Sequence, residues 1–123
     1  MYIGLISDTH GVFDEPLMEF LKPVDEVWHA GDFGTLEVAQ KVAAFKPMKG
    51  VYGNCDGQDI RFDNPHHRVF MCGGMKVLMV HIGGYPGRYD SRARALIDEH
   101  TPDLFVCGHS HILKVVNLSL IHI

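Results

Sequence analysis

Short apolar runs alternate with amphipathic segments along this chain, a pattern typical of an α/β protein. Runs with the length of buried strands lie at 2–7, 26–31, 49–53 and 103–108. Residues 67–81 form two further apolar runs on either side of Gly73-Gly74, which predicts a β-hairpin. Strands that alternate with helices pair in parallel through right-handed crossovers, so we expect a sheet that is covered by helices.

Three helices are predicted from capping signals and apolar spacing. Asp14 and Glu15 precede Pro16, which favours a helix that continues to residue 21. Thr35 is the predicted cap of a helix that continues to Phe45, and Ser91 is the predicted cap of one that stops at Thr101-Pro102. Residues 57–66 and the glycine-rich stretch 83–90 are predicted as loops, and "ILKVV" at 112–116 is predicted to begin another strand.

Composition narrows the class of protein. A chain of 123 residues with 46% hydrophobic content predicts one domain, 1–123. A net charge of −4 gives no support for a general nucleic-acid surface, and no apolar run reaches the roughly 18 residues of a membrane span. The first residues do not resemble a secretory signal, and three cysteines without CxxC spacing fit a reducing compartment, so we expect a cytoplasmic protein.

Metal-ligand residue types follow five successive predicted strands. They are Asp8, His10, Asp32, Asn54, His81, His109 and His111. The carboxyl ends of strands in α/β sheets line the ligand-binding edge, so these side chains are expected to meet. Three oxygen donors and four nitrogen donors exceed the four ligands of one tetrahedral zinc ion and suit a pair of ions. Mixed nitrogen and oxygen ligation favours Mn, Fe, Zn, Co or Ni over Ca or Mg.

A charge count predicts the chemistry of such a pair. Two divalent ions bring four positive charges, and Asp8, Asp32 and a bridging hydroxide remove three of them. The site would stay positive and attract a phosphoryl group, and water bound to the ions would have its pKa lowered towards ~7. These properties predict a two-metal phosphoesterase.

Five motifs in order resemble those of the calcineurin-like metallophosphoesterases. They are "DTHG", "GDFG", "GNCD", "VHIGG" and "GHSH", starting at residues 8, 31, 53, 80 and 108. Within that superfamily the chain is most similar to the small YfcE-type phosphodiesterase subgroup, which also resembles the retromer subunit Vps29. The resemblance implies a four-layer α/β/β/α sandwich with two sheets packed face to face.

The resemblance also implies a ligand set. One ion would be held by Asp8, His10, Asp32 and His111, and the second by Asp32, Asn54, His81 and His109, with Asp32 as the bridge. Mn²⁺ is the expected ion, with Ni²⁺, Zn²⁺, Fe²⁺ and Co²⁺ as alternatives. Asp32, Asn54 and His109 are the expected catalytic residues. Asp56 is expected to orient its neighbours. Arg88 is a candidate phosphate contact, and the alternative is that 83–90 is a plain loop without such a role.

The chain departs from the family pattern at two places. Larger relatives carry "GNHD", whose histidine helps to protonate the leaving group, and here that position is Cys55. We hypothesise that only good leaving groups are tolerated, or that His66 or His67 substitutes. Relatives also continue beyond "GHSH" into further strands, so we expect a C-terminally truncated domain that is less stable than one of family length, with residues 117–123 as a foreign tail.

The predicted function is phosphodiester hydrolysis by a hydroxide held between two ions. The expected partner is a small phosphate ester. We expect no membrane contact and no general nucleic-acid surface on this protein, and a homo-oligomer is compatible with the sequence. The alternatives are a non-catalytic scaffold like Vps29, a phosphomonoesterase and a nucleotide pyrophosphatase. Outside the motifs, His29 is expected to be a buried, hydrogen-bonded histidine, and Cys72 and Cys107 are expected to be small core residues.

Overall fold

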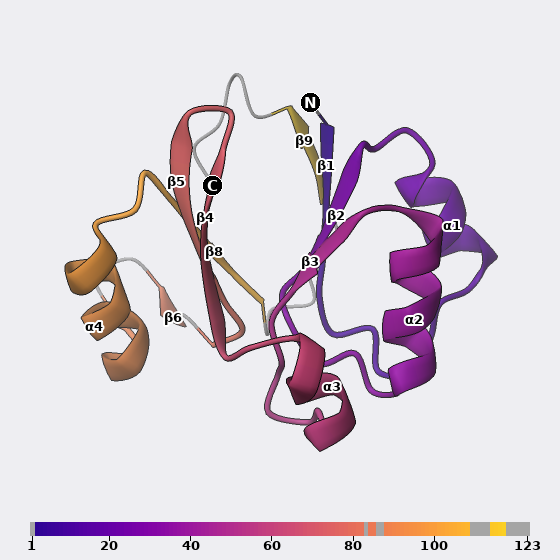
Figure 1. Ribbon diagram of the computed structural model, residues 1–123, viewed down its shortest axis with the longest axis horizontal. Helices are drawn as coiled ribbons and strands as arrows, with labels where there is room; N and C mark the ends of the chain where they lie inside the picture. Colours follow the sequence, from indigo (N-terminus) through magenta and orange to yellow (C-terminus); the bar gives the residue numbers. More distant parts are fainter. Residues whose placement is uncertain (1, 83, 86–87, 109–113, 118–123) are drawn as a thin grey trace.

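Two β-sheets face each other in the computed structural model, which describes residues 2–82, 84–85, 88–108 and 114–117 (Figure 1). The first sheet has the order β3-β2-β1-β9 and contains β1 (Tyr2–Ile6), β2 (Glu26–His29), β3 (Met48–Gly50) and β9 (Lys114–Asn117). The second has the order β4-β5-β8 and contains β4 (His67–Cys72), β5 (Met75–Val80) and β8 (Leu104–Cys107). A short ribbon pairs β6 (Gly84–Tyr85) with β7 (Arg88–Tyr89).

The strand pairings follow the predicted α/β pattern. β1, β2 and β3 pair in parallel, and β5 pairs in parallel with β8. The hairpin predicted around Gly73-Gly74 is the antiparallel pair β4-β5, in which Cys72 lies opposite Met75. The strand predicted after residue 111 is β9, which pairs antiparallel to β1. These predictions are confirmed.

The helices begin at capping side chains. α1 (Glu15–Leu21) is capped by Asp14, and α2 (Leu36–Phe45) is capped by Thr35, whose hydroxyl accepts from the N–H of Val38 at 3.3 Å. α4 (Ser91–His100) is capped by Asp90 and not by Ser91, so that prediction was wrong by one residue. Asp90 accepts from the N–H groups of residues 92 and 93, while Ser91 already lies inside the helix. α4 ends at His100, and Thr101 is its C-cap, so the predicted stop at Thr101-Pro102 is confirmed.

Residues 57–66 are not a continuous loop, which corrects the prediction. They contain α3 (Gln58–Asp63), which follows an extended Gly57. The side chain of Ile60 is 2% exposed and packs with the helices that cover the first sheet. Tertiary packing of this kind stabilises a short polar helix that the hydropathy pattern does not reveal. Within 83–90, β6 and β7 form the short ribbon.

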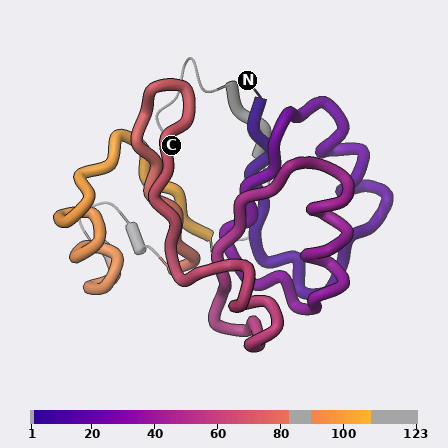
Figure 2. Tube along the Cα trace, in the orientation of Figure 1, coloured from indigo at the N-terminus to yellow at the C-terminus, as the bar shows by residue number. Residues whose placement is uncertain are grey.

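Three apolar clusters define four layers. The cluster between the sheets joins Trp28 and Leu5 of the first sheet to Val77 and Met79 of the second. The outer face of the first sheet packs on α1, α2 and α3, and the outer face of the second packs on α4 through Ala93. Figures 1 and 2 show α1 and α2 on one side of the paired sheets and α4 on the other. The predicted four-layer α/β/β/α sandwich is confirmed.

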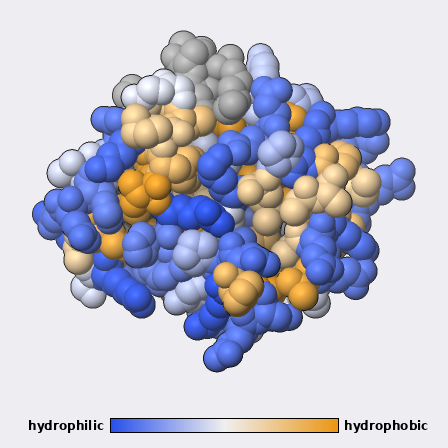
Figure 3. Space-filling view, viewed as in Figure 1, coloured by the Kyte–Doolittle hydropathy of each residue, from blue (hydrophilic) through white to orange (hydrophobic). Residues whose placement is uncertain are grey.

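The surface in view is mostly hydrophilic, with scattered apolar patches (Figure 3). Phe62 on α3 is the most exposed of the large apolar side chains that the structure describes, at 89%. No helix in the described part of the chain has the length and apolar character needed to cross a membrane.

Candidate metal centre

The loops after β1 and β2 run side by side at one end of the first sheet. The N–H groups of Asp8, His10 and Gly11 donate to the carbonyls of residues 31, 32 and 33 at 2.8, 3.1 and 2.7 Å. This ladder continues the parallel pairing of β1 with β2 past the ends of both strands. The "DTHG" and "GDFG" motifs are therefore held together by backbone hydrogen bonds.

Three of the predicted site residues have left-handed backbone conformations. Asp8, His10 and Asp32 have φ values of 58°, 48° and 60°. Asp and His tolerate this region better than most residues, although it still strains the backbone. Such conformations persist where the surrounding structure determines them and cluster at functional sites. Here they turn the side chains towards a common point beyond the strand ends.

Each of the two buried carboxylates has one oxygen held by the protein. The hydroxyl of Ser7 donates to Oδ2 of Asp8, and the backbone N–H of Cys55 donates to Oδ1 of Asp32 at 2.9 Å. Their side chains are 1% and 2% exposed. The opposite oxygens, Oδ1 of Asp8 and Oδ2 of Asp32, face imidazole nitrogens. These two oxygens are therefore the ones presented for ligation.

His81 comes to the same point from the second sheet. Its Nδ1 lies 2.7 Å from the carbonyl oxygen of Ala30. Because a carbonyl only accepts, Nδ1 is the donor in this contact, and Nε2 is the ring nitrogen left to act as a ligand. Nε2 lies 3.2 Å from Oδ2 of Asp32 and 3.9 Å from Oδ1 of Asp8. Ligand atoms of Asp8, Asp32 and His81 all lie within 4.8 Å of one another.

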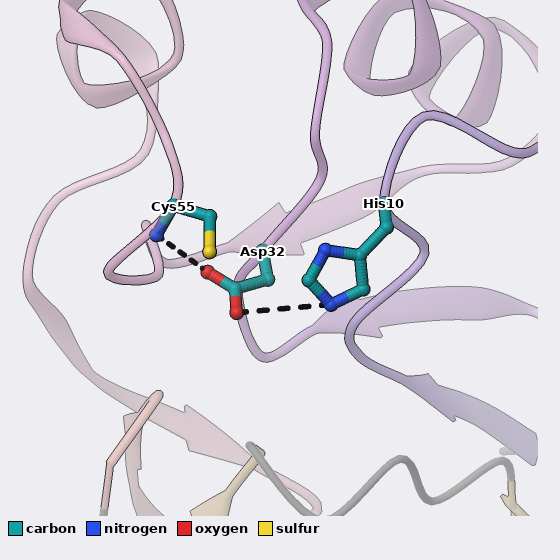
Figure 4. Close-up of side chains that lie close together, drawn as sticks. All are labelled: His10, Asp32 and Cys55. Atoms are coloured by element: carbon teal, nitrogen blue, oxygen red, sulfur yellow. Dashed lines mark hydrogen bonds and ion pairs between the residues drawn. The ribbon is translucent and has the colours of Figure 1, made fainter.

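His10 and Cys55 flank Asp32 on the more exposed side of the site (Figure 4). Nε2 of His10 lies 3.7 Å from Oδ1 of Asp8 and 4.0 Å from Oδ2 of Asp32. The sulfur of Cys55 forms a second group of possible ligand atoms with His10 and Asp32. The sequence predicted Cys55 as a substrate contact or a support for the ligands, but did not predict that its sulfur could itself be a ligand atom. The negative charge of Asp32 raises the pKa of the Cys55 thiol, which favours the protonated form.

Asp56 ties the loop that follows β3, in which it lies, to the loop that follows β2. Its carboxylate accepts from the backbone N–H groups of Asp32, Gly34 and Gly53 at 3.0, 3.1 and 2.8 Å. Gly53 has no room for a side chain, because an added Cβ would overlap the carboxylate of Asp32. A buried carboxylate with three donors fixes the loop that carries Asn54 and Cys55 against the loop that carries Asp32.

His29 supports the site from beneath, as a buried and hydrogen-bonded histidine. Its Nδ1 accepts from the N–H of Gly31 at 3.1 Å, so its Nε2 donates to the hydroxyl of Thr9 at 2.9 Å. Thr9 in turn donates to the carbonyl of Phe33 at 3.1 Å. Burial lowers the pKa of His29 to about 3, so the ring is neutral. The prediction for His29 is confirmed, but the role of Thr9 was missed.

Of the other predicted residues, the structure describes Asn54 in full and Arg88 by its backbone. Asn54 is exposed, with its amide nitrogen 3.8 Å from the sulfur of Cys55. The backbone of Arg88 pairs with Tyr85, and its side chain lies outside what the structure describes. His109 and His111 also lie outside the described residues. The residue before them, Gly108, packs so closely on Ser7 and Ala30 that an added Cβ would lie 2.6 and 2.7 Å from their oxygens.

The donor set fits a divalent cation. Two buried carboxylates face each other, and the ion pairs described for them come from imidazoles, which are charged only when protonated. Two carboxylates this close repel each other when both are ionised, and a cation between them would offset that repulsion. Carboxylate oxygens together with imidazole nitrogens are ligands that Mn, Fe, Zn, Co and Ni accept.

Comparison with known proteins agrees with this geometry. The family model of the calcineurin-like phosphoesterase superfamily domain matches residues 1–120. A probable metallophosphoesterase of Methanothermobacter thermautotrophicus is 28% identical over 116 residues, which are 90% of this chain and 67% of the relative. A solved archaeal phosphodiesterase is 26% identical with a TM-score of 0.66, over 91% of this chain and 74% of that one.

Vps29 shares the fold. The structure of Entamoeba histolytica Vps29 complexed with Zn²⁺ has a TM-score of 0.67 and 20% identity, over 93% of this chain and 67% of that one. The resemblance inferred from the five motifs is therefore confirmed by a match along nearly the whole chain. The chain belongs to the calcineurin-like phosphoesterase superfamily.

Proposed function

We propose that this protein is a metal-dependent phosphoesterase that hydrolyses phosphodiesters and holds two divalent ions. The observation that carries the proposal is the meeting of three donor atoms from two sheets, Oδ1 of Asp8, Oδ2 of Asp32 and Nε2 of His81. In each case the other polar atom of the side chain is fixed by a hydrogen bond within the protein. Such outer contacts are typical of metal ligands.

The proposed ligands are divided between two ions. Asp8, His10, Asp32 and His111 would hold the first, and Asp32, Asn54, His81 and His109 would hold the second, with Asp32 shared. Mn²⁺ is the proposed ion, and the Zn²⁺ complex of the Entamoeba histolytica Vps29 supports a transition metal in this fold. When bound, the ions supply Lewis acidity and lower the pKa of coordinated water to about 7.

The residues of the chain have distinct parts in this scheme. Asp32, Asn54 and His109 would contact the reacting centre, and His10, whose side chain is 46% exposed, lies on the side open to a substrate. Asp56 and His29 position these groups by holding their loops together. A site on loops that are held this way needs little rearrangement to bind its ions.

Diester specificity is proposed from a comparison with a known protein. The archaeal phosphodiesterase at 26% identity is the observation that favours it. The metal ligands alone do not distinguish diesters from monoesters, since the walls around the reacting phosphorus decide that choice. We therefore propose a phosphodiesterase. A phosphomonoesterase and a nucleotide pyrophosphatase are the alternatives, and assays with different phosphate esters distinguish them.

A protein-binding scaffold is the second candidate function. The similarity of the fold to Vps29 favours it, together with a groove between α2 and α3 beside the exposed ring of Phe62. A scaffold has no need of buried carboxylates that face each other, which are costly to keep without a cation. Metal binding with turnover would favour the enzyme, and a folded protein that binds no metal would favour the scaffold.

The proposal is tested by adding metal back to the chelated protein. Turnover of bis(p-nitrophenyl) phosphate and p-nitrophenyl phosphate is measured with Mn²⁺, Ni²⁺ or Zn²⁺, and calorimetry gives the number of ions bound. Asp32→Asn keeps an oxygen for the N–H of Cys55 but loses the charge, so we expect turnover to fall by more than the about 100-fold typical of outer-sphere variants.

The matched control is Glu37→Gln. Glu37 lies on α2 in an exposed ion pair with Lys41, and its variant should retain full turnover and both ions. Full activity and two bound ions in Asp32→Asn would contradict the bridging role. A folded wild-type protein without turnover under any of the three metals would contradict the enzyme.

A further inference from the structure

A second cavity opens directly beside the candidate metal centre. It has a volume of about 420 Å³ and lies between the chain that follows β3 and the start of α4. Its lining includes Tyr52, Asn54, Arg61, His66, His81 and Arg92. Asn54 and His81 are also proposed metal ligands, so a molecule in this cavity would be in contact with the reacting centre.

Arg61 is held in place on one wall of the cavity. Its guanidinium carbon lies 4.2 Å from the centre of the Tyr52 ring, and its Nε donates to the carbonyl of Asp56 at 2.9 Å. Within the described part of the chain, neither terminal amino group of Arg61 has a hydrogen-bond partner. A guanidinium that is fixed through Nε and one face presents its remaining donors at little entropic cost.

Arg92 and His66 complete the polar wall. Arg92 lies in the first turn of α4, and its side chain makes no ion pair with any residue that the structure describes. Burial, and after it the charge of Arg92, lowers the pKa of His66, so that ring is neutral at pH 7 and can donate or accept a hydrogen bond. Nδ1 of His66 lies 3.2 Å from Nδ1 of His67.

Asp90 is the one carboxylate among the cavity-lining residues. Its Oδ2 accepts from the N–H groups of Arg92 and Ala93 at 3.1 and 3.2 Å, so the start of α4 partly balances its charge. The cavity lining therefore has two positive side chains, Arg61 and Arg92, and one negative side chain, Asp90, so its net charge is positive. The sequence as a whole has a net charge of −4, so this local excess of positive charge is against the general trend.

We propose that this cavity, the Arg61–Arg92 pocket, binds a second phosphate group of the substrate, next to the diester at the metal centre. The inference rests on the proposed function for the identity of the neighbouring group. It assigns the substrate class to phosphodiesters that carry a terminal phosphate, such as a 5′-phosphorylated dinucleotide. Guanidinium groups pair with phosphate oxygens through parallel charge-assisted hydrogen bonds, which a neutral hydroxyl in the same place cannot match.

The test compares two substrates with the same scissile bond. They are dithymidine monophosphate with and without a 5′-phosphate, and the readout is the ratio of their kcat/KM values. We expect wild type to favour the phosphorylated dinucleotide by about tenfold or more, and Arg61→Met and Arg92→Met each to reduce that ratio about tenfold. The Arg92 side chain makes no hydrogen bond within the described part of the chain, so we expect Arg92→Met to fold as the wild type does.

Arg94→Met is the matched control. Arg94 lies on the same helix in an exposed pair with Asp98, and its variant should keep the wild-type ratio. A wild-type ratio near one, or an unchanged ratio in Arg92→Met, would overturn the pocket. If the protein hydrolyses neither dinucleotide nor bis(p-nitrophenyl) phosphate, the proposed function fails. The pocket is then tested by calorimetry of both dinucleotides with the metal-free protein. Equal affinities for the two dinucleotides would overturn the pocket, and tighter binding of the phosphorylated one, lost in Arg92→Met, would support it.

Discussion

The imidazole of His81 donates through Nδ1 to the carbonyl oxygen of Ala30 at 2.7 Å, and this contact joins the ends of the two sheets. The next residue, Gly31, has φ of 103° and lies so close to the ring that an added Cβ would be 2.7 Å from Nδ1. The orientation of Nε2 towards Asp32 therefore depends on the absence of a side chain at residue 31. This dependence can be tested with a single methyl group.

Gly31→Ala should displace His81 and weaken metal binding. Gly74→Ala is the matched control, because Gly74 also has a positive φ, 80°, but open space around its Cβ. Both variants bear the cost of a left-handed alanine, about 1–2 kcal/mol. We expect Gly31→Ala to lose at least about 1 kcal/mol more in urea unfolding, and about tenfold or more in Mn²⁺ affinity by calorimetry. Equal losses in the two variants would contradict the role of the ring contact.

Asp56→Asn should loosen the loops around the site. Three backbone N–H groups share the Asp56 carboxylate, whereas an amide offers one oxygen and turns an NH₂ group towards the remaining donors. We expect a loss of about 2–4 kcal/mol in the free energy of unfolding, measured in urea, and weaker metal binding. Asp98→Asn, on the exposed face of α4, should cost less than about 0.5 kcal/mol. A similar loss in both would argue against Asp56 as the tie between loops.

Acid should destabilise the metal-free protein through His29. Burial holds its pKa at about 3 in the folded protein, whereas the unfolded chain has the ordinary value near 6.5. Below pH 6.5 the unfolded state binds a proton that the folded state does not, so stability is lost as pH falls from 6.5 towards 3, at up to about 1.4 kcal/mol per pH unit.

His29→Gln should reduce by one the number of protons that unfolding takes up in acid, which makes the free energy of unfolding depend less steeply on pH. Urea unfolding at several pH values between 4.5 and 7.5 gives the slope, and the variant should be less stable at pH 7 while losing less on acidification. His100→Gln, at the end of α4, is the control that should keep the wild-type slope. An unchanged slope in His29→Gln would show that other groups dominate acid unfolding.

Cys55→His should improve the hydrolysis of esters with poor leaving groups. The Cys55 thiol is a weak hydrogen-bond donor, whereas a protonated imidazole can give its proton to the departing oxygen. Over a series of aryl esters of thymidine 5′-phosphate, log kcat should depend less steeply on the pKa of the leaving phenol in Cys55→His than in wild type. Cys55→Ala should leave the steep dependence, and equal slopes in all three proteins would count against the hypothesis.

Much of the fold was predictable because it depends on local patterns. The positions of the strands, the Gly73-Gly74 hairpin and the cap at Thr35 each follow from residues that are neighbours in sequence. α3 was missed because its stability comes from burying Ile60 against distant helices, which overrides its polar composition. The cap of α4 was misplaced by one residue because Asp90 and Ser91 are both good capping types, and tertiary packing decides between them.

The candidate site was predictable in its residue types more than in its geometry. Five motifs at strand ends predict where Asp8, Asp32 and His81 lie, and the structure brings these three together. The supports of the site depend on backbone that is far apart in sequence. Thr9 meets His29, and Asp56 bonds to the loop that follows β2, and no local pattern encodes such contacts. Cys55 was predicted beside the ligands or the substrate, but the approach of its sulfur to His10 and Asp32 as a possible ligand atom depends on the same kind of distant contact.

The position of the site at the end of both sheets makes the fold responsive to its ligand. Asp8 and Asp32 follow strands of the first sheet, and His81 follows β5 of the second, so one ion held between them would fasten the two halves of the sandwich. An ion that binds only the folded state adds about 2.7 kcal/mol at a free concentration of one hundred times its Kd. The thermal midpoint of this protein should therefore rise and fall with the supply of free metal around it.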